Sequence, residues 1–370
     1  MMRITDIRAR NGRGQAIEGT IGEHTLWFDF RDRPAPALRA DPFLAAAFLP
    51  AMARGEAIEV DDRFPVSPQL LAGLAQLQEI YLRWYSWARP TVVQATNVSP
   101  APVGDGTATL FSGGVDSSYT VVREHERLSH LLLVDRVDLG KTPLDAVFNE
   151  VIAEHTTTAA AVGVKLAVAH TNIKDICHAF GLDWSDYLGP ALSAVAMAGG
   201  FATLFIPSSA SWADLTPAGS HPVTDPKWST EGLQIVHHGC GARRIDKLAA
   251  IAVPGLPRLT RLRVCLQGGQ HNCGRCEKCL RTMAGARALG LTIPTLPRLD
   301  DLAALRQLNI RSQPILEDWI ELLDVVSPAD DPEFFAALSA LIKRIRVRWL
   351  VRDLDHTLTG GRFRRILHRD

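Results

Sequence analysis

The sequence predicts an α/β fold built on a doubly wound parallel sheet. From about residue 107 to residue 236, short apolar runs alternate with segments of helical periodicity, as is typical of parallel βαβ units. The composition indicates a folded chain, because 46% of the 370 residues are hydrophobic and 22% are charged, as in ordinary globular proteins. At about 100–200 residues per domain, this length corresponds to roughly two domains, or to one large domain with additions.

Residues 1–100 are predicted to form an N-terminal α+β extension. Alternating runs at Gln15–Thr20 and His24–Phe30 predict a β-hairpin. Asp41–Met52 predicts a helix, and its first residue has the side chain of a good N-cap. A second helix is expected to open at Ser67, and its apolar stripe is expected to pack into the core.

The α/β region is assigned to residues 101–260. Its strands are predicted from five short apolar runs, Thr107–Phe111, Leu131–Val134, Lys165–Ala169, Phe201–Ile206 and Leu233–Val236. Helices are expected between them, notably at Leu144–Val162 and Ala191–Ala198. The pattern after Pro297 is helical, so residues 291–370 are assigned to a C-terminal helical region. Ligands of such sheets bind at the carboxyl ends of the strands, and residues that follow a strand are therefore the candidates for a site.

Charge and hydropathy restrict the partners and the location that we expect. Lys plus Arg and Asp plus Glu each number 40, and this zero net charge argues against nucleic-acid binding over the whole surface but leaves a local basic patch open. The uncharged stretch Leu188–Ser208 could span a bilayer by length alone. Pro190 and Gly199-Gly200 interrupt it, so a buried helix, a turn and a strand are expected instead. The N-terminus lacks the apolar core of a signal peptide, and a cytoplasmic location is expected.

The first strand of the α/β region runs directly into Ser112-Gly113-Gly114-Val115-Asp116-Ser117, and a helix is expected to follow. Two glycines let the backbone turn tightly and approach a ligand closely. The free N–H groups and the dipole of the following helix favour an anion there. The loop matches neither G-x-x-x-x-G-K-[ST] nor G-x-G-x-x-G. An ordinary helix N-cap with a glycine turn is the alternative interpretation.

This motif, SGGVDS between a strand and a helix, resembles the pyrophosphate loop (PP-loop) of the N-type ATP pyrophosphatases. The resemblance implies a Rossmann-like sheet of the adenine nucleotide alpha hydrolase type, and a substrate oxygen that attacks the α-phosphorus of ATP. It implies that Asp116 orients the loop or approaches Mg²⁺, and that Asp116 and Ser117 take part in catalysis. The residues that it assigns to ATP are Ser112, Gly113, Gly114, Val115, Asp116, Ser117 and, beside adenine, Val134.

A cysteine cluster is predicted within residues 261–290, formed by Cys265, Cys273, Cys276 and Cys279. Four thiolates with CxxC spacing satisfy a tetrahedral Zn²⁺, and a site with all four positions filled by protein is structural. An iron–sulfur cluster and redox disulfides are the alternatives. Cys177 and Cys240 have no such partners, and each is expected to be a small buried hydrophobe.

The two motifs together resemble the 7-cyano-7-deazaguanine synthase (QueC-like) enzymes over about residues 105–290. That resemblance implies that ATP activates the carboxylate of 7-carboxy-7-deazaguanine or a related deazapurine, with zinc held beside the active site. Ammonia would then capture the acyl group as an amide, and a second activation would give a nitrile. The stretch Gly219–Pro226 departs from the adjacent aspartate and arginine expected of true synthases, and this departure leaves the carboxylate open.

Further candidates follow the last two predicted strands. Polar and aromatic residues of one loop are expected to contact the substrate, with a solvated loop as the alternative: Ser209, Asp214, His221, Asp225 and Trp228. Arg244 and Lys247 lie three apart on one helical face and are candidates for neutralising phosphate charge, with a plain basic surface as the alternative. His237 and His238 are either bases or packed residues.

Three functions stay open on the sequence alone. The first is an ATP-dependent carbon–nitrogen ligase that adenylates a carboxylate, releases pyrophosphate and passes the acyl group to ammonia or to an amine of a protein partner. The second is a tRNA-modifying PP-loop enzyme that transfers sulfur, favoured by nine Lys/Arg against three Asp in residues 341–370. The third is a non-catalytic nucleotide-binding scaffold in a larger complex.

Overall fold

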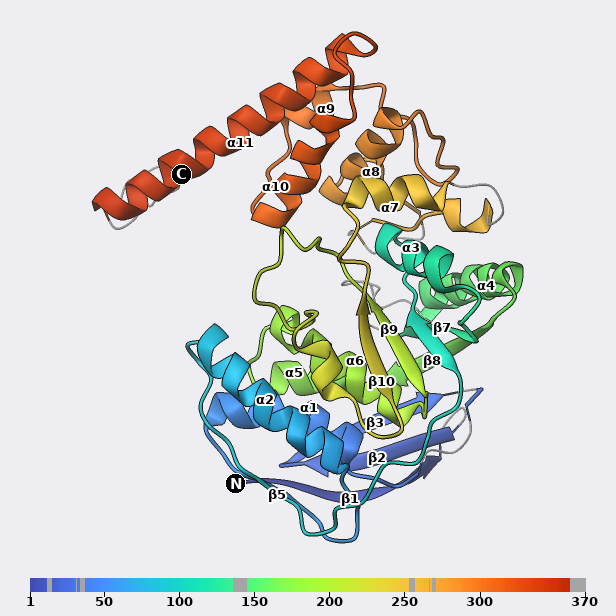
Figure 1. Ribbon diagram of the computed structural model, residues 1–370, viewed down its shortest axis with the longest axis vertical. Coiled ribbons are helices and arrows are strands. Elements are labelled where there is room, and N and C mark those ends of the chain that lie inside the picture. Colours follow the sequence, from blue (N-terminus) through green and yellow to red (C-terminus); the bar gives the residue numbers. More distant parts are fainter. Residues whose placement is uncertain are drawn as a thin grey trace.

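The computed structural model describes residues 1–11, 15–30, 32–33, 37–135, 145–252, 257–265, 267 and 271–359. These residues form a mixed α/β structure around one sheet (Figure 1). Within the described chain the sheet has ten strands in the order β10-β9-β6-β7-β8-β3-β2-β1-β4-β5. Neighbouring strands run parallel except in the pairs β8–β3, β3–β2 and β2–β1.

The strands fall into an N-terminal and a central group along the chain. The N-terminal group is β1 (Met2–Asn11), β2 (Gln15–Ile21), β3 (His24–Phe30), β4 (Ile58–Val60) and β5 (Val93–Gln94). The central group is β6 (Thr107–Leu110), β7 (His130–Val134), β8 (Lys165–Thr171), β9 (Thr203–Pro207) and β10 (Gln234–His238). The predicted hairpin and the five predicted central strands are therefore confirmed, close to their predicted limits.

The helices also match the predicted pattern, with additions. The N-terminal and central helices are α1 (Asp41–Arg54), α2 (Pro68–Trp84), α3 (Val115–Glu124), α4 (Asp145–Val162), α5 (Ile173–Ala179), α6 (Trp184–Ala198) and the 3₁₀ turn η1 (Asp225–Trp228). The later ones are α7 (Arg244–Ile251), η2 (Pro257–Thr260), α8 (Glu277–Ala288), α9 (Ala303–Arg306), α10 (Gln313–Ile320), η3 (Glu321–Asp324) and α11 (Pro332–Thr359).

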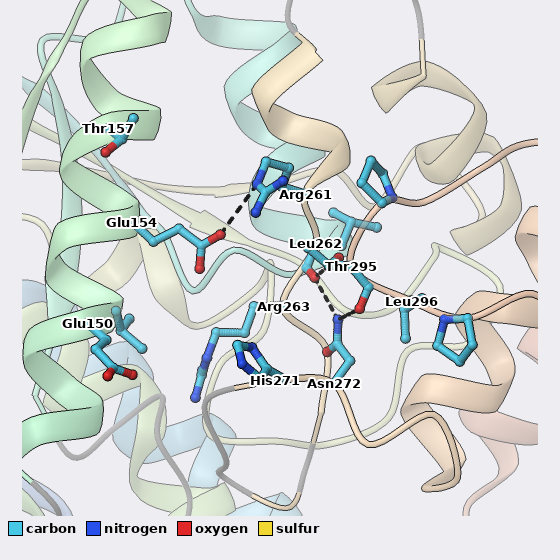
Figure 2. A pocket seen from close by; sticks show the side chains of 13 residues that line it. Glu150, Glu154, Thr157, Arg261, Leu262, Arg263, His271, Asn272, Thr295 and Leu296 are labelled. Atoms are coloured by element: carbon cyan, nitrogen blue, oxygen red, sulfur yellow. Dashed lines mark hydrogen bonds and ion pairs between the residues drawn. The ribbon is translucent and has the colours of Figure 1, made fainter.

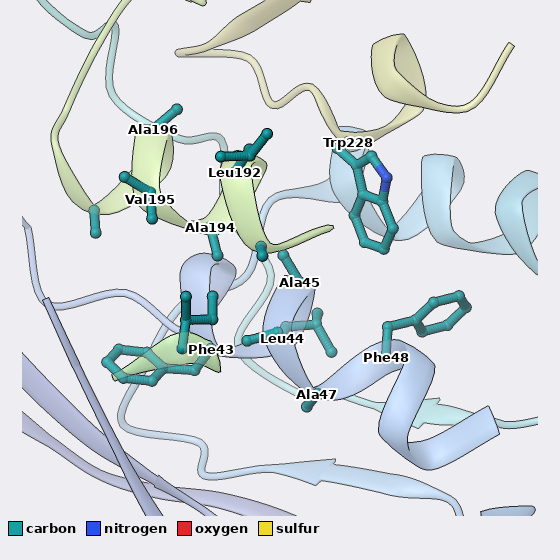
Figure 3. Close-up of a cluster of buried hydrophobic side chains, with 14 of the residues drawn as sticks. Phe43, Leu44, Ala45, Ala47, Phe48, Leu192, Ala194, Val195, Ala196 and Trp228 are labelled. Atoms are coloured by element: carbon teal, nitrogen blue, oxygen red, sulfur yellow. The ribbon is translucent and has the colours of Figure 1, made fainter. Parts of the chain in front are cut away.

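Helices cover both faces of the sheet. Successive side chains of a buried strand point to opposite faces, so one strand can contribute to the cores on both sides. Leu132 and Val134 of β7 pack into one core with α1, α2, α5 and α6. Leu131 of the same strand packs into a second core with α3, α7, α8 and the C-terminal helices. Figure 3 shows part of the first core, where Phe43 and Phe48 of α1 lie among side chains of α6 and Trp228.

The N-terminal strands continue the central sheet. β3 pairs antiparallel with β8, so that Phe28 stands opposite Thr171 and Phe30 opposite Ala169. The first core accordingly contains residues from both sides of the predicted boundary near residue 100.

The N-cap prediction for Asp41 was wrong. Ala40 is the N-cap of α1, and Asp41 is the first helical residue. Its carboxylate instead accepts from the backbone N–H of Ser67 at 2.7 Å and from Arg39 Nε at 2.5 Å. The buried carboxylate therefore ties the start of α1 to the start of α2, where Ser67 caps the helix by accepting from Leu70 N–H.

The uncharged stretch Leu188–Ser208 forms most of α6, a turn and β9. Gly200 in that turn has φ +63°, a backbone conformation that favours glycine. Among the described residues, none of the helices is both long and apolar enough to span a bilayer.

Candidate functional site

The glycine loop lies where the sequence places it, between the end of β6 and the start of α3. Gly113 has φ +75°, and a Cβ there would lie 3.1 Å from Cε1 of His155. Gly114 is the N-cap of α3 and has no side chain to satisfy the first N–H groups of the helix. Those groups have no intrahelical acceptor and carry the positive end of the helix dipole. The loop therefore presents an anion-binding backbone.

The two serines of the motif support the loop. Ser117 Oγ donates to the carbonyl of Gly114 at 3.1 Å and lies 3.4 Å from Ser112 Oγ. Val115 is buried in the second core, so its backbone alone is available to a ligand. Val134 is likewise buried at the end of β7, and residues 136–144 that follow it lie outside the described residues.

Asp116 of the loop lies between two cations of α7. Lys247 Nζ is 3.2 Å from Asp116 Oδ1, and Arg244 Nη1 is 3.3 Å from Asp116 Oδ2. Lys247 is only 1% exposed and also donates to the carbonyl of Ser208 at 2.7 Å. Burial by itself would raise the pKa of Asp116, but the charges of Arg244, Lys247 and Lys278 outweigh it and lower that pKa. The structure thus brings both basic candidates to the loop.

Besides Asp116, the Arg244 guanidinium contacts a hydroxyl group and a second carboxylate. Its Nη2 lies 3.4 Å from Thr282 Oγ1, and its Nε lies 4.0 Å from a carboxylate oxygen of Asp318. Asp318 also pairs closely with Arg281 of α8. Burial raises the pKa of Asp318, and these two arginines oppose that rise. The network fixes the Arg244 guanidinium beside the loop.

Three neighbouring parallel strands bring the rest of the site to one edge of the sheet. β6, β9 and β10 are adjacent, so their carboxyl ends lie side by side. β6 leads to the glycine loop, β9 to Ser208, and β10 to Gly239 and Cys240. The N–H of Ser208 donates to the carbonyl of His238 at 2.7 Å and ties the last two ends together.

A pocket of about 690 Å³ opens beside the loop, between α4 and the segment that leads to the cysteine cluster. Figure 2 shows Glu150 and Glu154 on α4 facing Arg261, Arg263 and His271 across it. Arg261 Nε lies 3.7 Å from Glu154 Oε1. The N–H of Arg263 donates to the carbonyl of Gly113 at 2.8 Å, so the pocket wall is joined to the loop. This volume lies within the range of small-molecule sites, about 300–1,000 Å³.

The buried side chain of His155 lies against the glycine loop. Its ring packs edge-on against Phe111 and lies next to Gly113. Burial and the positive charge of Arg263 lower the pKa of His155 to about 4, so the imidazole is neutral at pH 7.

The four predicted cysteines come together and could hold a metal ion such as zinc. The ligand atoms of Cys265, Cys273, Cys276 and Cys279 all lie within 4.8 Å of one another. Cys273 Sγ and Cys279 Sγ are 3.9 Å apart, close to the separation of about 3.8 Å that Zn–S bonds of about 2.3 Å give in a tetrahedron. The N–H of Cys276 donates to Cys273 Sγ at 3.3 Å, as suits a thiolate.

Asn272 supports the cluster from outside. Its Oδ1 accepts from the N–H groups of Val264 and Cys265, and its Nδ2 donates to the carbonyls of Leu262 and Thr295. Figure 2 shows the last two bonds as dashed lines. The Asn272 amide therefore fixes the backbone that runs from the pocket wall to Cys265, the first cysteine of the cluster.

Two of the five predicted substrate residues lie in the loop that follows β9, near the carboxyl end of that strand. Ser209 is exposed directly after Ser208, and Asp214 accepts a short hydrogen bond from Ser211 in the same loop. Trp212 between them is 65% exposed.

The other three predicted substrate residues lie in the interior, and this placement corrects the expectation that they contact substrate. Trp228 is 0% exposed and packs edge-on against Phe48 (Figure 3). His221 is buried against Trp84. Asp225 is 0% exposed and accepts from His237 Nδ1 at 2.7 Å. The reason is that η1 packs tightly on α2, where a Cβ at Gly73 would lie 1.9 Å from the carbonyl oxygen of Lys227.

Sequence reasoning missed Arg263, His155 and the environment of Cys240. Cys240 Sγ lies 3.3 Å from Ser208 Oγ at the end of β10. Its position four residues after the predicted strand Leu233–Val236 was a usable signal, but its partners are His237 of β10, Ser208 after β9 and Lys247 of α7. Comparison of the chain with family models, with curated proteins and with solved structures finds no match. The function of this chain is therefore inferred from the geometry of its site and from its motifs.

Proposed function

We propose that this protein is an ATP-dependent carbon–nitrogen ligase of the PP-loop type, which adenylates a carboxylate and passes the acyl group to an amine. The observation that carries the proposal is the glycine loop at the start of α3 with Lys247 and Arg244 beside it. The positive end of the α3 helix dipole and the two cations would stabilise the negative charge of a leaving pyrophosphate.

The sheet supports a nucleotide at this place. Counted from β6, the order β8-β7-β6-β9-β10 reads 3-2-1-4-5, as in doubly wound sheets. In such sheets the order reverses beside the first strand, and ligands bind outside the carboxyl ends there. The glycine loop follows that first strand, β6. The pocket lined by Glu150, Glu154 and Arg263 then offers room for the nucleoside next to the loop.

Each charged residue has a role in the proposed reaction. The triphosphate would bring Mg²⁺, for which Asp116 is the carboxylate of the loop itself. When ATP binds, Lys247 and Arg244 would contact the phosphates, and their ion pairs with Asp116 would become weaker. The four cysteines would hold Zn²⁺ as a structural ion, which keeps Arg263 against Gly113. The expected carboxylate is 7-carboxy-7-deazaguanine or a related deazapurine, and Glu150 and Glu154 suit the N–H donors of such a ring.

The test is exchange of radiolabelled pyrophosphate into ATP, with Mg²⁺ and 7-carboxy-7-deazaguanine. Asp116→Asn should lower exchange by about 100-fold or more. Asp175→Asn is the matched control, because Asp175 also lies in the first turn of a helix but is exposed and far from the loop along the sheet. Wild-type protein that binds ATP but shows no exchange would instead favour the scaffold function.

Sulfur transfer to tRNA is a second candidate, favoured by the thiol of Cys240 near the loop. Its test is transfer of labelled sulfur to tRNA. A sulfur adduct on Cys240 would identify this reaction, whereas pyrophosphate exchange that depends on a carboxylate would identify the ligase.

A further inference from the structure

A buried Asp–His pair stands behind the edge of the sheet. Asp225 Oδ2 lies 2.7 Å from His237 Nδ1, and both side chains are at least 95% buried. Asp225 also accepts from Ser220 Oγ at 2.7 Å and from the N–H of His221 at 3.2 Å. These bonds fix the carboxylate, and the carboxylate fixes the orientation of the imidazole through Nδ1.

Cys240 lies two residues after the end of β10 and interacts electrostatically with His237 of that strand. The Nε2 atom of His237 is buried and completes no hydrogen bond within the described part of the chain. Burial by itself would lower the pKa of His237, but hydrogen bonding to Asp225 and the contact with Cys240 raise it to about 9. Burial likewise opposes the thiolate of Cys240, yet His237, Ser208 and Lys247 together lower the pKa of that thiol. Cys240, His237 and Asp225 thus have the side-chain types of a nucleophile, its base and the group that orients the base.

The thiol is also connected to the glycine loop. Cys240 Sγ lies 3.3 Å from Ser208 Oγ, and the carbonyl of Ser208 accepts from Lys247 Nζ at 2.7 Å. The same Nζ lies 3.2 Å from Asp116. Lys247 therefore contacts both Asp116 of the glycine loop and Ser208, whose hydroxyl in turn contacts the Cys240 thiol.

The second isolated cysteine shows what an ordinary buried thiol looks like in this chain. Cys177 donates to the carbonyl of Leu182 at 3.3 Å, and burial together with Asp183 raises its pKa to about 12. It has no imidazole among its described partners. The prediction that both cysteines are simple hydrophobes fits Cys177, whereas Cys240 has the surroundings of an activated nucleophile.

We propose that Cys240 is a catalytic nucleophile that accepts the acyl group as a thioester before the amine attacks, with His237 as its base and Asp225 as the residue that positions His237. This proposal rests on the proposed function, because the acyl group must first be activated by ATP. The ligand class is an acyl adenylate, and the second ligand is a primary amine or ammonia.

The steps balance without a further reagent. The thiolate attacks the carbonyl carbon, a C–S bond forms, the C–O bond to phosphate breaks, and AMP leaves with the electron pair. Once the negative charge on sulfur is gone, His237 gives its proton to solvent. The amine then attacks the thioester, a C–N bond forms, the C–S bond breaks, and His237 accepts a proton from the attacking nitrogen. The amide leaves, and the thiolate–imidazolium pair is restored.

Burial of the thiol is consistent with this role. Cys240 is 4% exposed, and the N–H of Trp212 in the loop above it donates to its carbonyl at 2.9 Å. Attack therefore requires the segment around Trp212 to move aside when substrate enters. A cover of this kind excludes water, and water would otherwise hydrolyse the thioester.

The experiment uses the full chain with ATP, Mg²⁺ and radiolabelled 7-carboxy-7-deazaguanine, without added amine. The reaction is stopped in acid, and label on the denatured protein is measured before and after neutral hydroxylamine, which cleaves thioesters. We expect label on the wild-type protein that hydroxylamine releases, and peptide mapping should place it on Cys240. This mapping requires no variant and therefore does not depend on how a variant folds.

Variants then separate the two proposals. With ammonium chloride added, Cys240→Ala should lower the ratio of amide formation to pyrophosphate exchange by at least about 100-fold. Cys177→Ala, the matched control, should leave that ratio and the label as in wild type. Exchange without any protein-bound label, or an unchanged ratio in Cys240→Ala, overturns the thioester and leaves the ligase intact. Absence of exchange in wild type overturns the proposed function itself, and a sulfur adduct in place of the acyl group overturns the thioester in favour of sulfur transfer.

Discussion

The backbone N–H of Arg263 donates to the carbonyl of Gly113 at 2.8 Å, and this bond joins the cysteine cluster to the glycine loop. Arg263 lies two residues before Cys265, the first cysteine of the cluster. Order at the cluster should therefore determine how well the loop is held.

Loss of the proposed metal is expected to weaken nucleotide binding as well as the fold. Cys276→Ser should lower the zinc content, lower the melting temperature and weaken ATP binding together, because the segment at Arg263 loses its anchor. Metal content, thermal unfolding and ATP titration are measured on the same samples, with Cys177→Ser as the control. Loss of zinc with unchanged ATP affinity would contradict the coupling.

The glycine at the centre of the loop is expected to be irreplaceable. Gly113→Ala combines φ +75° with a Cβ 3.1 Å from His155, and it should weaken ATP binding in addition to lowering stability. Gly163→Ala is the matched control, since its φ is +83° but no described atom lies within 4 Å of the added Cβ. Both should lose about 1–2 kcal/mol of stability from the left-handed backbone. Equal ATP affinity in the two variants would count against a phosphate at the loop.

Lys247→Met should reduce pyrophosphate exchange by about 100-fold, because a buried cation beside the loop is lost. The pKa of Asp116 is lowered in the folded protein, so its ion pairs stabilise the fold above the unfolded pKa of about 4 and are lost as the pH falls through the lower folded value. The stability difference between wild type and Lys247→Met should therefore shrink in acid. Denaturant unfolding at pH 7 and pH 3 measures it, and Lys165→Met on the exposed start of β8 is the control.

The pH dependence of alkylation reports the state of Cys240. The groups that face it or its base are His237 of β10, Asp225 of η1, His221, Lys247 of α7 and Ser208 after β9. A lowered thiol pKa means that thiolate persists at lower pH, so iodoacetamide should modify Cys240 at neutral pH faster than Cys177. His237→Gln should shift the Cys240 profile to higher pH while leaving the rates at pH 10 similar. An unshifted profile, read by mass spectrometry of the two peptides, would show that the imidazole does not activate the thiol.

Two tryptophans distinguish the interior of the substrate loop from its surface. Trp228→Ala should destabilise the fold by about 3–5 kcal/mol, because a fully buried ring packed on Phe48 is removed. Trp212→Ala should change stability by less than about 0.5 kcal/mol, because its side chain is largely exposed. Chemical denaturation of both variants is the measurement, and similar values would contradict the assignment of Trp228 to the core.

The sequence predicted the elements whose signals are local. The central strands are short apolar runs, and the hairpin at β2 and β3 alternates cleanly, so both could be located. β1 was missed because its pairing with β2 shifts register between Thr5 and Arg8, where Asp6 has φ +54°. That irregularity breaks the period of two by which a strand is recognised.

The site was predictable only where its residues are close in sequence. The glycine loop and the four cysteines each lie within a short segment, and Arg244 and Lys247 share one helix. The partners of Asp225 and Cys240 come from separate elements, so no spacing reveals them. The loop with His221 and Trp228 was expected to contact the substrate because it follows a strand and is rich in Gly and Pro, but its packing on α2 buries both side chains.

The antiparallel junction between β3 and β8 has a practical consequence for the design of a minimal fragment that contains the glycine loop. A truncation that begins at residue 101 would remove β3, the neighbour of β8, and would expose the apolar side chains of α6 that pack against α1. Such a fragment should aggregate through its unpaired backbone groups, so expression trials are expected to succeed only with the N-terminal hairpin and α1 retained.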